Sequence, residues 1–189
     1  MDPDGFIIRI ASEKDQQFAE EISKETELSA IARGSGIAKR TPDSIREKLS
    51  SGKAVIAVAK SGKWAGFSYI EVWANGEFVS NSGLIVAPEF RKGGVAKAIK
   101  KKIFALGRKL FPAAKIFSIT TGLAIMKMNA RLKFETVTFN ELPHETAFWE
   151  GCRSCVNFDI LKLKNFKNCL CTAMLFQPVQ SCPKIEKHG

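Results

Sequence analysis

An arginine, a lysine and two glycines stand between an apolar run and an amphipathic segment, and together they could bind an anion. They are Arg91-Lys92-Gly93-Gly94, and the apolar run before them ends at Val86. Glycine lets the backbone approach a ligand closely, so that several N–H groups can point toward it. The positive end of a helix dipole would add to this attraction. We expect a pyrophosphate-binding turn, with Arg91 adding a charge-assisted contact; a plain turn with sterically useful glycines is the alternative.

Cysteines form a second group of residues that could do chemistry. Cys152 and Cys155 are one close pair, and Cys169 and Cys171 are another. Two such pairs are typical of a four-thiolate zinc or iron–sulfur site. The second pair also fits a buried strand, in which cysteine packs as a small hydrophobic side chain. We therefore keep the metal site as a minority alternative and assign no metal ligand.

The composition is that of a globular protein with an affinity for anions. The 189 residues are 45% hydrophobic and 25% charged, with a net charge of +10. A basic chain favours nucleic acid, a membrane surface or a phosphorylated small molecule. The basic residues are spread along the chain, which favours the small anion over nucleic acid. The absence of a signal-like start and an odd count of cysteines favour a cytoplasmic protein without a membrane anchor.

Apolar periodicity and turn residues define the elements that must position these groups. The helix that follows Gly94 has Val95, Ile99 and Ile103 at helical spacing, with lysines elsewhere on its surface. We expect an irregular connection over residues 28–39, and the segment 149–168 matches no single element. The expected strands are Phe6–Ala11, Ala54–Lys60, Trp64–Trp73, Phe78–Val86, Lys115–Thr120, Phe134–Phe139 and Leu170–Phe176, and the expected helices run from Ser12 to about Lys24, from Pro42 to about Ser51, from Gly94 to Leu110 and over residues 122–132.

This order predicts a mixed α/β layer fold in a single domain, residues 1–178, followed by a polar tail, residues 179–189. Hairpins come first, and strand–helix–strand units follow. The order and the glycine turn together resemble the GNAT superfamily of N-acetyltransferases. Its acetyl-CoA signature has three defining positions, which Arg91, Gly94 and Ala96 fill here, with the lead-in Val86 to Glu89 before them. The resemblance covers about the first three-quarters of the chain.

The resemblance implies a mostly antiparallel sheet with helices on both faces and a splayed strand pair that binds acyl-CoA. The pantetheine arm would lie between the strand through Leu84 and Val86 and the strand Lys115–Thr120. Backbone N–H groups of Lys92, Gly93, Gly94, Val95 and Ala96 would hold the pyrophosphate. Lys97 and Lys100 would meet further phosphate charge, whereas Lys101 and Lys102 fit a solvated helix face.

The expected catalytic groups are less regular. GNAT members often carry a tyrosine five residues before a Gly-Phe pair, to protonate the departing thiolate; here the pair is Lys133-Phe134 and Asn129 takes the tyrosine position. Asn129 can hydrogen-bond the CoA sulfur but is no practical acid, so water or a cysteine thiol is left for that role. Glu71 is the candidate general base and shares a strand face with Tyr69. An exposed strand carboxylate is the alternative reading of Glu71.

Several short sequence segments, among them YIEVW and CLCTAML, also resemble those of a GNAT group of bacterial arginine biosynthesis that acylates the α-amino group of glutamate. Guanidinium groups bind carboxylates through two hydrogen bonds, so Arg33 and Arg40 are the candidate substrate-binding residues. Asn81 is a third, whereas Lys39 and Lys127 are weaker candidates. Each cation can equally be a plain surface residue.

The expected function is transfer of an acetyl or succinyl group from acyl-CoA to the amine of a small acidic acceptor, with glutamate first, in amino-acid biosynthesis. The alternatives are an acetyltransferase acting on a protein or polyamine amine, and a CoA-sensing or nucleic-acid-binding module without catalysis. A strongly basic chain does not suit a cation-rich acceptor. A homodimer is left open. Neither His144, in a loop, nor His188, in the tail, belongs to a triad or metallohydrolase pattern.

Overall fold

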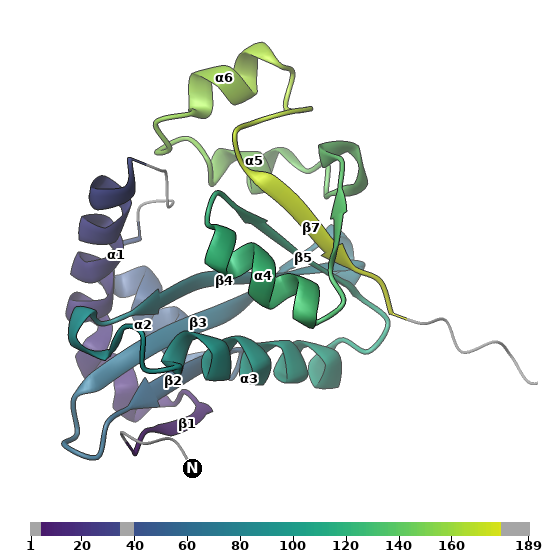
Figure 1. Ribbon diagram of the computed structural model, residues 1–189. Helices are drawn as coiled ribbons and strands as arrows, with labels where there is room; N and C mark the ends of the chain where they lie inside the picture. The colour runs from purple at the N-terminus through teal and green to yellow at the C-terminus, as the bar shows by residue number, and fades with distance from the viewer. Residues whose placement is uncertain (1–4, 35–39, 179–189) are drawn as a thin grey trace, which may run out of the picture.

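The protein is built on one seven-stranded sheet, with helices on both faces (Figure 1). The computed structural model describes residues 5–34 and 40–178. The sheet order is β1-β2-β3-β4-β5-β7-β6. The strands are β1 (Ile7–Ile10), β2 (Ala54–Val58), β3 (Trp64–Trp73), β4 (Phe78–Val86), β5 (Lys115–Thr120), β6 (Glu135–Val137) and β7 (Thr172–Phe176), and the helices are α1 (Ala19–Arg33), α2 (Pro42–Ser50), α3 (Val95–Leu110), α4 (Leu123–Arg131), α5 (Thr146–Glu150) and α6 (Phe158–Leu163).

The sheet changes direction once, in its centre. β1 to β4 are successive antiparallel neighbours, and β5, β7 and β6 form a second antiparallel group. β4 and β5 join the two groups as the one parallel pair among the described strands. Their pairing covers only Phe78–Ser80 of β4 and Lys115–Phe117 of β5. Beyond Ser80 and Phe117 the two strands part, and a fork opens in the middle of the sheet.

Three apolar clusters hold the layers together. The stripe Val95, Ile99 and Ile103 of α3 packs on one face of the sheet. On the opposite face, α1 and α2 cover the first half of the sheet through Ile22, Ile45 and other buried side chains. The third cluster lies under α5 and α6, around Phe117 of β5 and Trp149 of α5. The C-terminal segment therefore has its own packed core and completes one end of the molecule (Figure 1).

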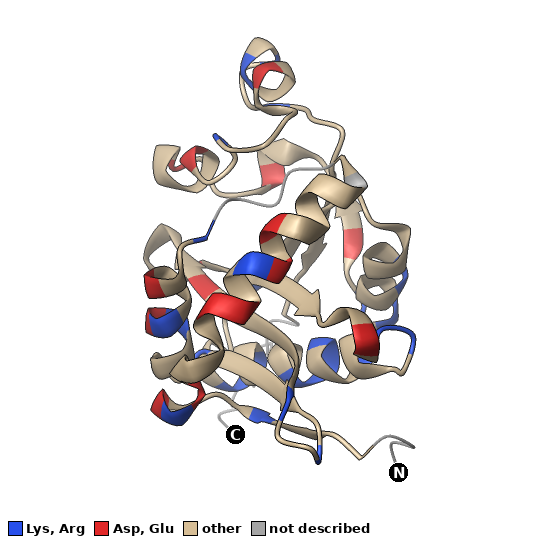
Figure 2. Ribbon diagram, turned by 90° about the vertical axis from the view of Figure 1, so that its left-hand side faces the viewer, with Lys and Arg blue, Asp and Glu red and all other residues tan. Residues whose placement is uncertain are grey.

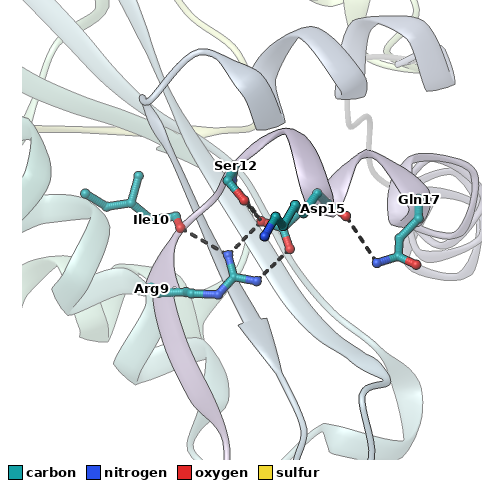
Figure 3. Close-up of polar contacts among 6 residues, drawn as sticks. Arg9, Ile10, Ser12, Asp15 and Gln17 are labelled. Carbon is teal, nitrogen blue, oxygen red and sulfur yellow. Dashed lines mark hydrogen bonds and ion pairs between the residues drawn. The ribbon is translucent and has the colours of Figure 1, made fainter.

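An ion pair ties the first strand to the helical layer. Both terminal nitrogens of Arg9 donate to Asp15 at 2.7 Å, and the backbone N–H of Ser12 donates to the same carboxylate at 2.8 Å (Figure 3). Burial of Asp15 opposes its ionisation, but these hydrogen bonds outweigh that cost and lower the pKa of the carboxyl. The 3-10 helix Glu13–Phe18 is thereby fixed against β1 before α1 begins.

Most expected elements are confirmed, and two expectations were wrong. β3, β4 and β5 have the expected bounds, and α3 begins directly after Gly94. The first helix does not end near Lys24, because α1 continues to Arg33; residues 28–33 are therefore helical, not irregular. The expected irregular residues 35–39 and the tail 179–189 lie outside the described residues. The segment 149–168 contains the end of α5 and all of α6.

Charge is distributed over the whole molecule. Figure 2 shows Lys and Arg on many elements, with Asp and Glu between them. Over the described residues, this distribution agrees with the spread of basic residues along the sequence and contains no single basic arm. Across the described residues, no helix combines the length and the apolar content needed to cross a bilayer.

Candidate active site

A cavity of about 590 Å³ opens where β4 and β5 part. Its walls come from β3, β4 and β5, from α3 and α4, and from the C-terminal segment that carries α5 and α6. Leu84 and Val86 of β4 line one side, and Ile119 and Thr120 of β5 line the other. The fork in the sheet is therefore an open cleft that passes from the α3 side to the side covered by α1 and α2.

A bulge in β4 shapes this cleft. Phe67 pairs with Ile85 and Tyr69 pairs with Ser82, so two residues of β4, Gly83 and Leu84, stand opposite one residue of β3. Gly83 has φ +62°, and a Cβ there would lie 2.4 Å from the Tyr69 ring. Only glycine therefore fits this position without displacing the tyrosine. The residues around Gly83 did not predict this bulge from the sequence.

The backbone beyond the bulge is directed into the gap. The Ala87 N–H donates to the Ala65 carbonyl of the β3 side at 3.0 Å. Because successive residues of a strand point their N–H and C=O groups to opposite edges, Val86 and Leu84 direct theirs toward the missing β5 partner. The carbonyl of Val86 accepts a hydrogen bond from Arg91 Nε at 3.2 Å. An extended ligand lying in the cleft could pair with the remaining groups of this edge.

The start of α3 is open to a ligand. Lys92 has φ +68° and Gly94 has φ +86°, and no heavy atom lies within 4 Å of where a Gly94 Cβ would be. No side chain caps the helix. The first N–H groups of a helix have no partner within the helix, so those at Val95 and Ala96 are available to a ligand. The turn is open and uncapped, and its anion-binding role stays a prediction.

Arg91 has a different set of partners from the one that the motif suggested. Its guanidinium pairs with Glu25 of α1 and donates to Ser29 Oγ at 2.9 Å. Ser29 in turn donates to Glu25 at 2.6 Å. Arg91 still lines the cavity. In this structure Arg91 links the turn before α3 to α1, and its contact with a phosphate stays a prediction.

The side of the cavity under α2 carries a cation at its wall. Arg40 lines the cavity, and its Nε donates to the hydroxyl of Tyr69. The guanidinium also lies over the Tyr69 ring, 5.3 Å from the centroid. Burial raises the pKa of Tyr69 to about 12, so the phenol stays protonated. Tyr69, which the sequence offered only as a neighbour of Glu71, therefore holds Arg40 at the cavity.

Glu71 also lines the cavity, and its partner is Lys48 of α2, whose Nζ is 3.2 Å from the carboxylate. Lys48 further lies over the Tyr69 ring at 5.2 Å. Glu71 and Tyr69 thus face the α2 side, as strand alternation predicted. Nothing in the sequence pointed to Lys48, because α2 meets β3 only in the folded chain. About a quarter of the Glu71 side chain (27%) is exposed, so a solvent-borne ligand can reach it.

The remaining predicted residues are placed as follows. Asn81 lines the cavity on the α3 side, with both polar atoms of its amide buried and without a hydrogen-bond partner. Asn129 does not line it: the side chain is fully buried, and its amide nitrogen donates to the Met174 sulfur at 3.6 Å. Lys127 is exposed on the outer side of α4. Lys39 lies outside the described residues, and Arg33 is placed only as the last residue of α1.

All four cysteines of the described C-terminal segment line the cavity. Burial raises the pKa of Cys152 to about 11 and that of Cys171 to about 12, with the neighbouring cysteines adding to each shift. These thiols therefore stay protonated at neutral pH. Within residues 5–34 and 40–178, no group of three or more His, Cys, Asp or Glu has an arrangement that could hold a metal ion. The minority expectation of a four-thiolate site finds no support in this geometry.

Comparisons with known proteins place the architecture. No model of a protein family matches the chain. No curated protein matches its sequence. Among solved structures, an N-acetylglutamate synthase from Neisseria gonorrhoeae, complexed with coenzyme A and N-acetyl-glutamate, superposes with a TM-score of 0.63 at 17% identity, over 92% of this chain and 35% of that one. This chain thus spans about a third of that synthase.

Two further solved structures match over nearly their whole length. The protein Rv2747 from Mycobacterium tuberculosis, in complex with CoA and NLQ, superposes with a TM-score of 0.63 at 18% identity, over 90% of this chain and 98% of that one. The putative acetyltransferase yncA from Salmonella typhimurium, solved with acetyl-CoA, superposes with a TM-score of 0.64 at 13% identity. The match covers 94% of this chain and 96% of that one. The overall arrangement of strands and helices thus has counterparts in known proteins: this chain has the fold of the GNAT acetyltransferases.

Proposed function

We propose that this protein is an acyl-CoA-dependent N-acyltransferase whose acceptor is a small amine that also carries carboxylates, with the α-amino group of glutamate as the leading case. The observation that carries the proposal is the junction of two features. The sheet parts at Ser80 and Phe117, and the open, uncapped start of α3 lies beyond the parted end of β4. Such a junction accepts an extended arm in the cleft and a pyrophosphate at the helix start.

The residues present fit an acyl-CoA. The free backbone edge at Leu84 and Val86 can pair with amide groups of a pantetheine arm, as a strand would. The open space at Gly94 leaves room for a pyrophosphate against the first N–H groups of α3. Solved neighbours of this fold contain CoA or acetyl-CoA in their complexes, which supports the same donor here. Bound in this way, the donor would supply a thioester at the inner part of the cleft.

The acceptor side supports an acidic substrate. Arg40 brings positive charge to the cavity from the α2 side, and Lys48 lies beside it as the partner of Glu71. A guanidinium matches a carboxylate with two hydrogen bonds, and Tyr69 holds Arg40 in place for that contact. The synthase from Neisseria gonorrhoeae was solved with N-acetyl-glutamate, which is consistent with an acidic acceptor. Because the identity is only 17%, glutamate itself is a proposal for this chain.

The chemistry follows from the groups that face the cavity. Glu71 accepts a proton from the ammonium of the acceptor, with the Nζ of Lys48 3.2 Å from its carboxylate. The neutral amine then attacks the thioester carbonyl carbon, the new C–N bond forms, and the C–S bond breaks. The sulfur leaves as a thiolate and takes up a proton. Cys152 and Cys171 are poor donors for it, because their raised pKa makes loss of their proton unfavourable, so water is the donor that we propose.

The test is release of free CoA thiol from acetyl-CoA and succinyl-CoA with a panel of acceptors: glutamate, aspartate, glutamine and spermidine. Glutamine is the matched control, because it differs from glutamate in one charge. We expect release with glutamate and at least tenfold less with glutamine, the order of one lost charged hydrogen bond. Release with spermidine alone would replace the acidic acceptor by a polyamine. Tight CoA binding without release for any acceptor would leave a CoA-binding module.

A further inference from the structure

Three buried polar side chains meet the cavity at the point where the sheet forks. Asn81 of β4 and Ser118 of β5 directly follow the last pair, Ser80 and Phe117. Because side chains alternate along a strand, both lie on the face that carries Val79 and Ile116, which is the face under α3. Lys100 comes from α3 itself. All three line the cavity, and their exposed fractions are 8%, 6% and 2%.

Lys100 is the most unusual of the three. The sequence suggested a lysine on the solvated or phosphate-facing side of α3, and Lys97, Lys101 and Lys102 are indeed exposed. Lys100 instead points inward, with its Nζ over the Phe134 ring at 5.3 Å from the centroid. Burial alone lowers its pKa to about 7. A buried ammonium without an anionic partner is costly, and no carboxylate of the described residues contributes to the shift.

The two strand residues also lack hydrogen-bond partners among the described residues, and the polar atoms of Asn81 are the more deeply buried. Both polar atoms of the Asn81 amide are buried without a hydrogen bond in the described structure. The Ser118 side chain, 6% exposed, forms no hydrogen bond within the described residues. Nearly all buried polar groups in proteins are paired with protein, water or ligand. An ammonium, an amide NH₂ and a hydroxyl that share one cavity therefore form a set of hydrogen-bond donors that is incomplete without a guest.

We propose that this polar set, Lys100, Asn81 and Ser118, receives the terminal carboxylate of a dicarboxylic acyl group, so that the preferred donor is an acyl-CoA such as succinyl-CoA and not a neutral one. The inference rests on the proposed binding of acyl-CoA in the cleft. A carboxylate offers two acceptor oxygens for three donors. Its negative charge also stabilises the ammonium of Lys100, which an acetyl or butyryl group would leave without a partner.

The phosphates of the same donor are a less suitable source of the anion. They belong at the exposed start of α3, where Gly94 opens to free space. Lys100 lies six residues further along the helix, which is about 9 Å at the helical rise, and its side chain is almost completely buried. Asn81 and Ser118 lie at the closed end of the fork. The part of an extended donor that reaches this end is its acyl group.

The experiment measures binding without an acceptor, so that no turnover is needed. Isothermal titration at pH 7 compares CoA, butyryl-CoA and succinyl-CoA. The two acyl groups have four carbons each and differ in the terminal carboxylate. We expect succinyl-CoA to bind at least about tenfold more tightly than butyryl-CoA, the least effect of one charged hydrogen bond. Lys100→Met should bring this ratio to about one while butyryl-CoA binds as before. Lys101→Met, an exposed neighbour, should keep the ratio.

Each other result overturns the inference. Equal affinities for succinyl-CoA and butyryl-CoA in the unaltered protein would show that the polar set does not bind the terminal carboxylate. Equal weakening of CoA, butyryl-CoA and succinyl-CoA by Lys100→Met would assign Lys100 to a phosphate. An acyl adduct located on Lys100 by peptide mass spectrometry would make Lys100 an acceptor of the acyl group instead of a binding residue. Failure of CoA itself to bind would contradict the proposed function, whereas CoA binding without a preference would contradict only this inference.

Discussion

The two sides of the cavity are built in different ways. The donor side consists of the β4 edge, the glycine turn and the start of α3, and it comes from one continuous stretch, residues 78–110. Its contacts are mainly backbone groups. The proposed acceptor side consists of side chains from two regions: Arg40 just before α2, and Glu71 on β3, which is paired with Lys48 of α2. Phe148 and Trp149 of α5 close it from the C-terminal segment.

This difference teaches which kind of site tolerates sequence change. Backbone N–H groups exist whatever the side chains are, so the donor side needs only glycines and a helix start. The acceptor side depends on individual charges and on how the helices bring them together. Identity of only 13–18% to solved neighbours is therefore compatible with a shared donor site and a different acceptor. The predictions below test that division.

The largest expected effect is on the acceptor side. Glu71→Gln removes the proposed base, so kcat should fall by about 10²–10⁴-fold, the usual contribution of general-base catalysis. The measurement is thiol release at saturating substrates and pH 7. The matched control is Glu77→Gln. Glu77 also pairs with a lysine, because the Nζ of Lys115 lies 3.2 Å from its carboxylate, but this pair is away from the cavity. CoA affinity should not change in either variant, and a loss below tenfold for Glu71→Gln would exclude it as the base.

On the donor side, Gly94→Asp should have the largest effect, a loss of CoA affinity. The new carboxylate would stand at the start of α3, where it repels a pyrophosphate and fills the open space, so CoA affinity should fall by about 100-fold, as for loss of several charged contacts. Gly62→Asp is a close control: Gly62 has φ +83° and equally open surroundings. Both variants carry the same backbone strain. Titration with CoA should separate them, and equal CoA affinity in the two would contradict the assigned helix start.

Arg40→Gln should act on the acceptor alone. Loss of a charged hydrogen bond raises the KM for glutamate by about 10–100-fold, whereas CoA affinity stays unchanged. Steady-state kinetics with glutamate and glutamine make the test, because the KM for an acceptor that does not use Arg40 should not move. A fall in kcat with an unchanged KM would instead assign Arg40 to the chemical step.

The smallest effect concerns stability and uses the buried cation of the donor side. In the unfolded chain a lysine has its ordinary pKa of about 10.4, whereas burial lowers the pKa of Lys100 to about 7. Between these values the unfolded state binds more protons, so stability should rise with pH. Below pH 7 both states are protonated, and the folded state bears the full cost of the buried charge.

Lys100→Met removes that cost. The free energy of unfolding at pH 6 should rise by on the order of 2 kcal/mol, and the gain should shrink as the pH rises toward 10. Denaturant unfolding at pH 6 and 9 makes the measurement, with Lys101→Met as the exposed control. A gain that is the same at both pH values would mean that packing, not the ammonium, is responsible.

The sequence predicted the central part of the fold well because its signals are local. Runs of largely apolar residues on either side of the turn sequence Asn75-Gly76 indicate β3 and β4, whose expected bounds are confirmed. The helical stripe Val95, Ile99 and Ile103 predicted α3, and the stripe is buried as expected. The end of α1 was misplaced, because glycines at 34 and 36 suggested an early break, whereas the helix continues to Arg33 and ends with Gly34 in the left-handed conformation.

What the sequence by itself determined is a strand, a glycine turn and a helix in one stretch, the elements of the proposed donor half, because their backbone geometry follows from residue types at fixed spacing. Only the tertiary structure decided the rest. Lys100 and Lys101 are neighbours in the sequence, yet one is buried against Phe134 and the other is exposed. Lys48 meets Glu71, and Tyr69 holds Arg40, only because α2 packs on β3. Burial and charge pairing depend on which distant elements pack together, and local residue spacing does not predict that packing.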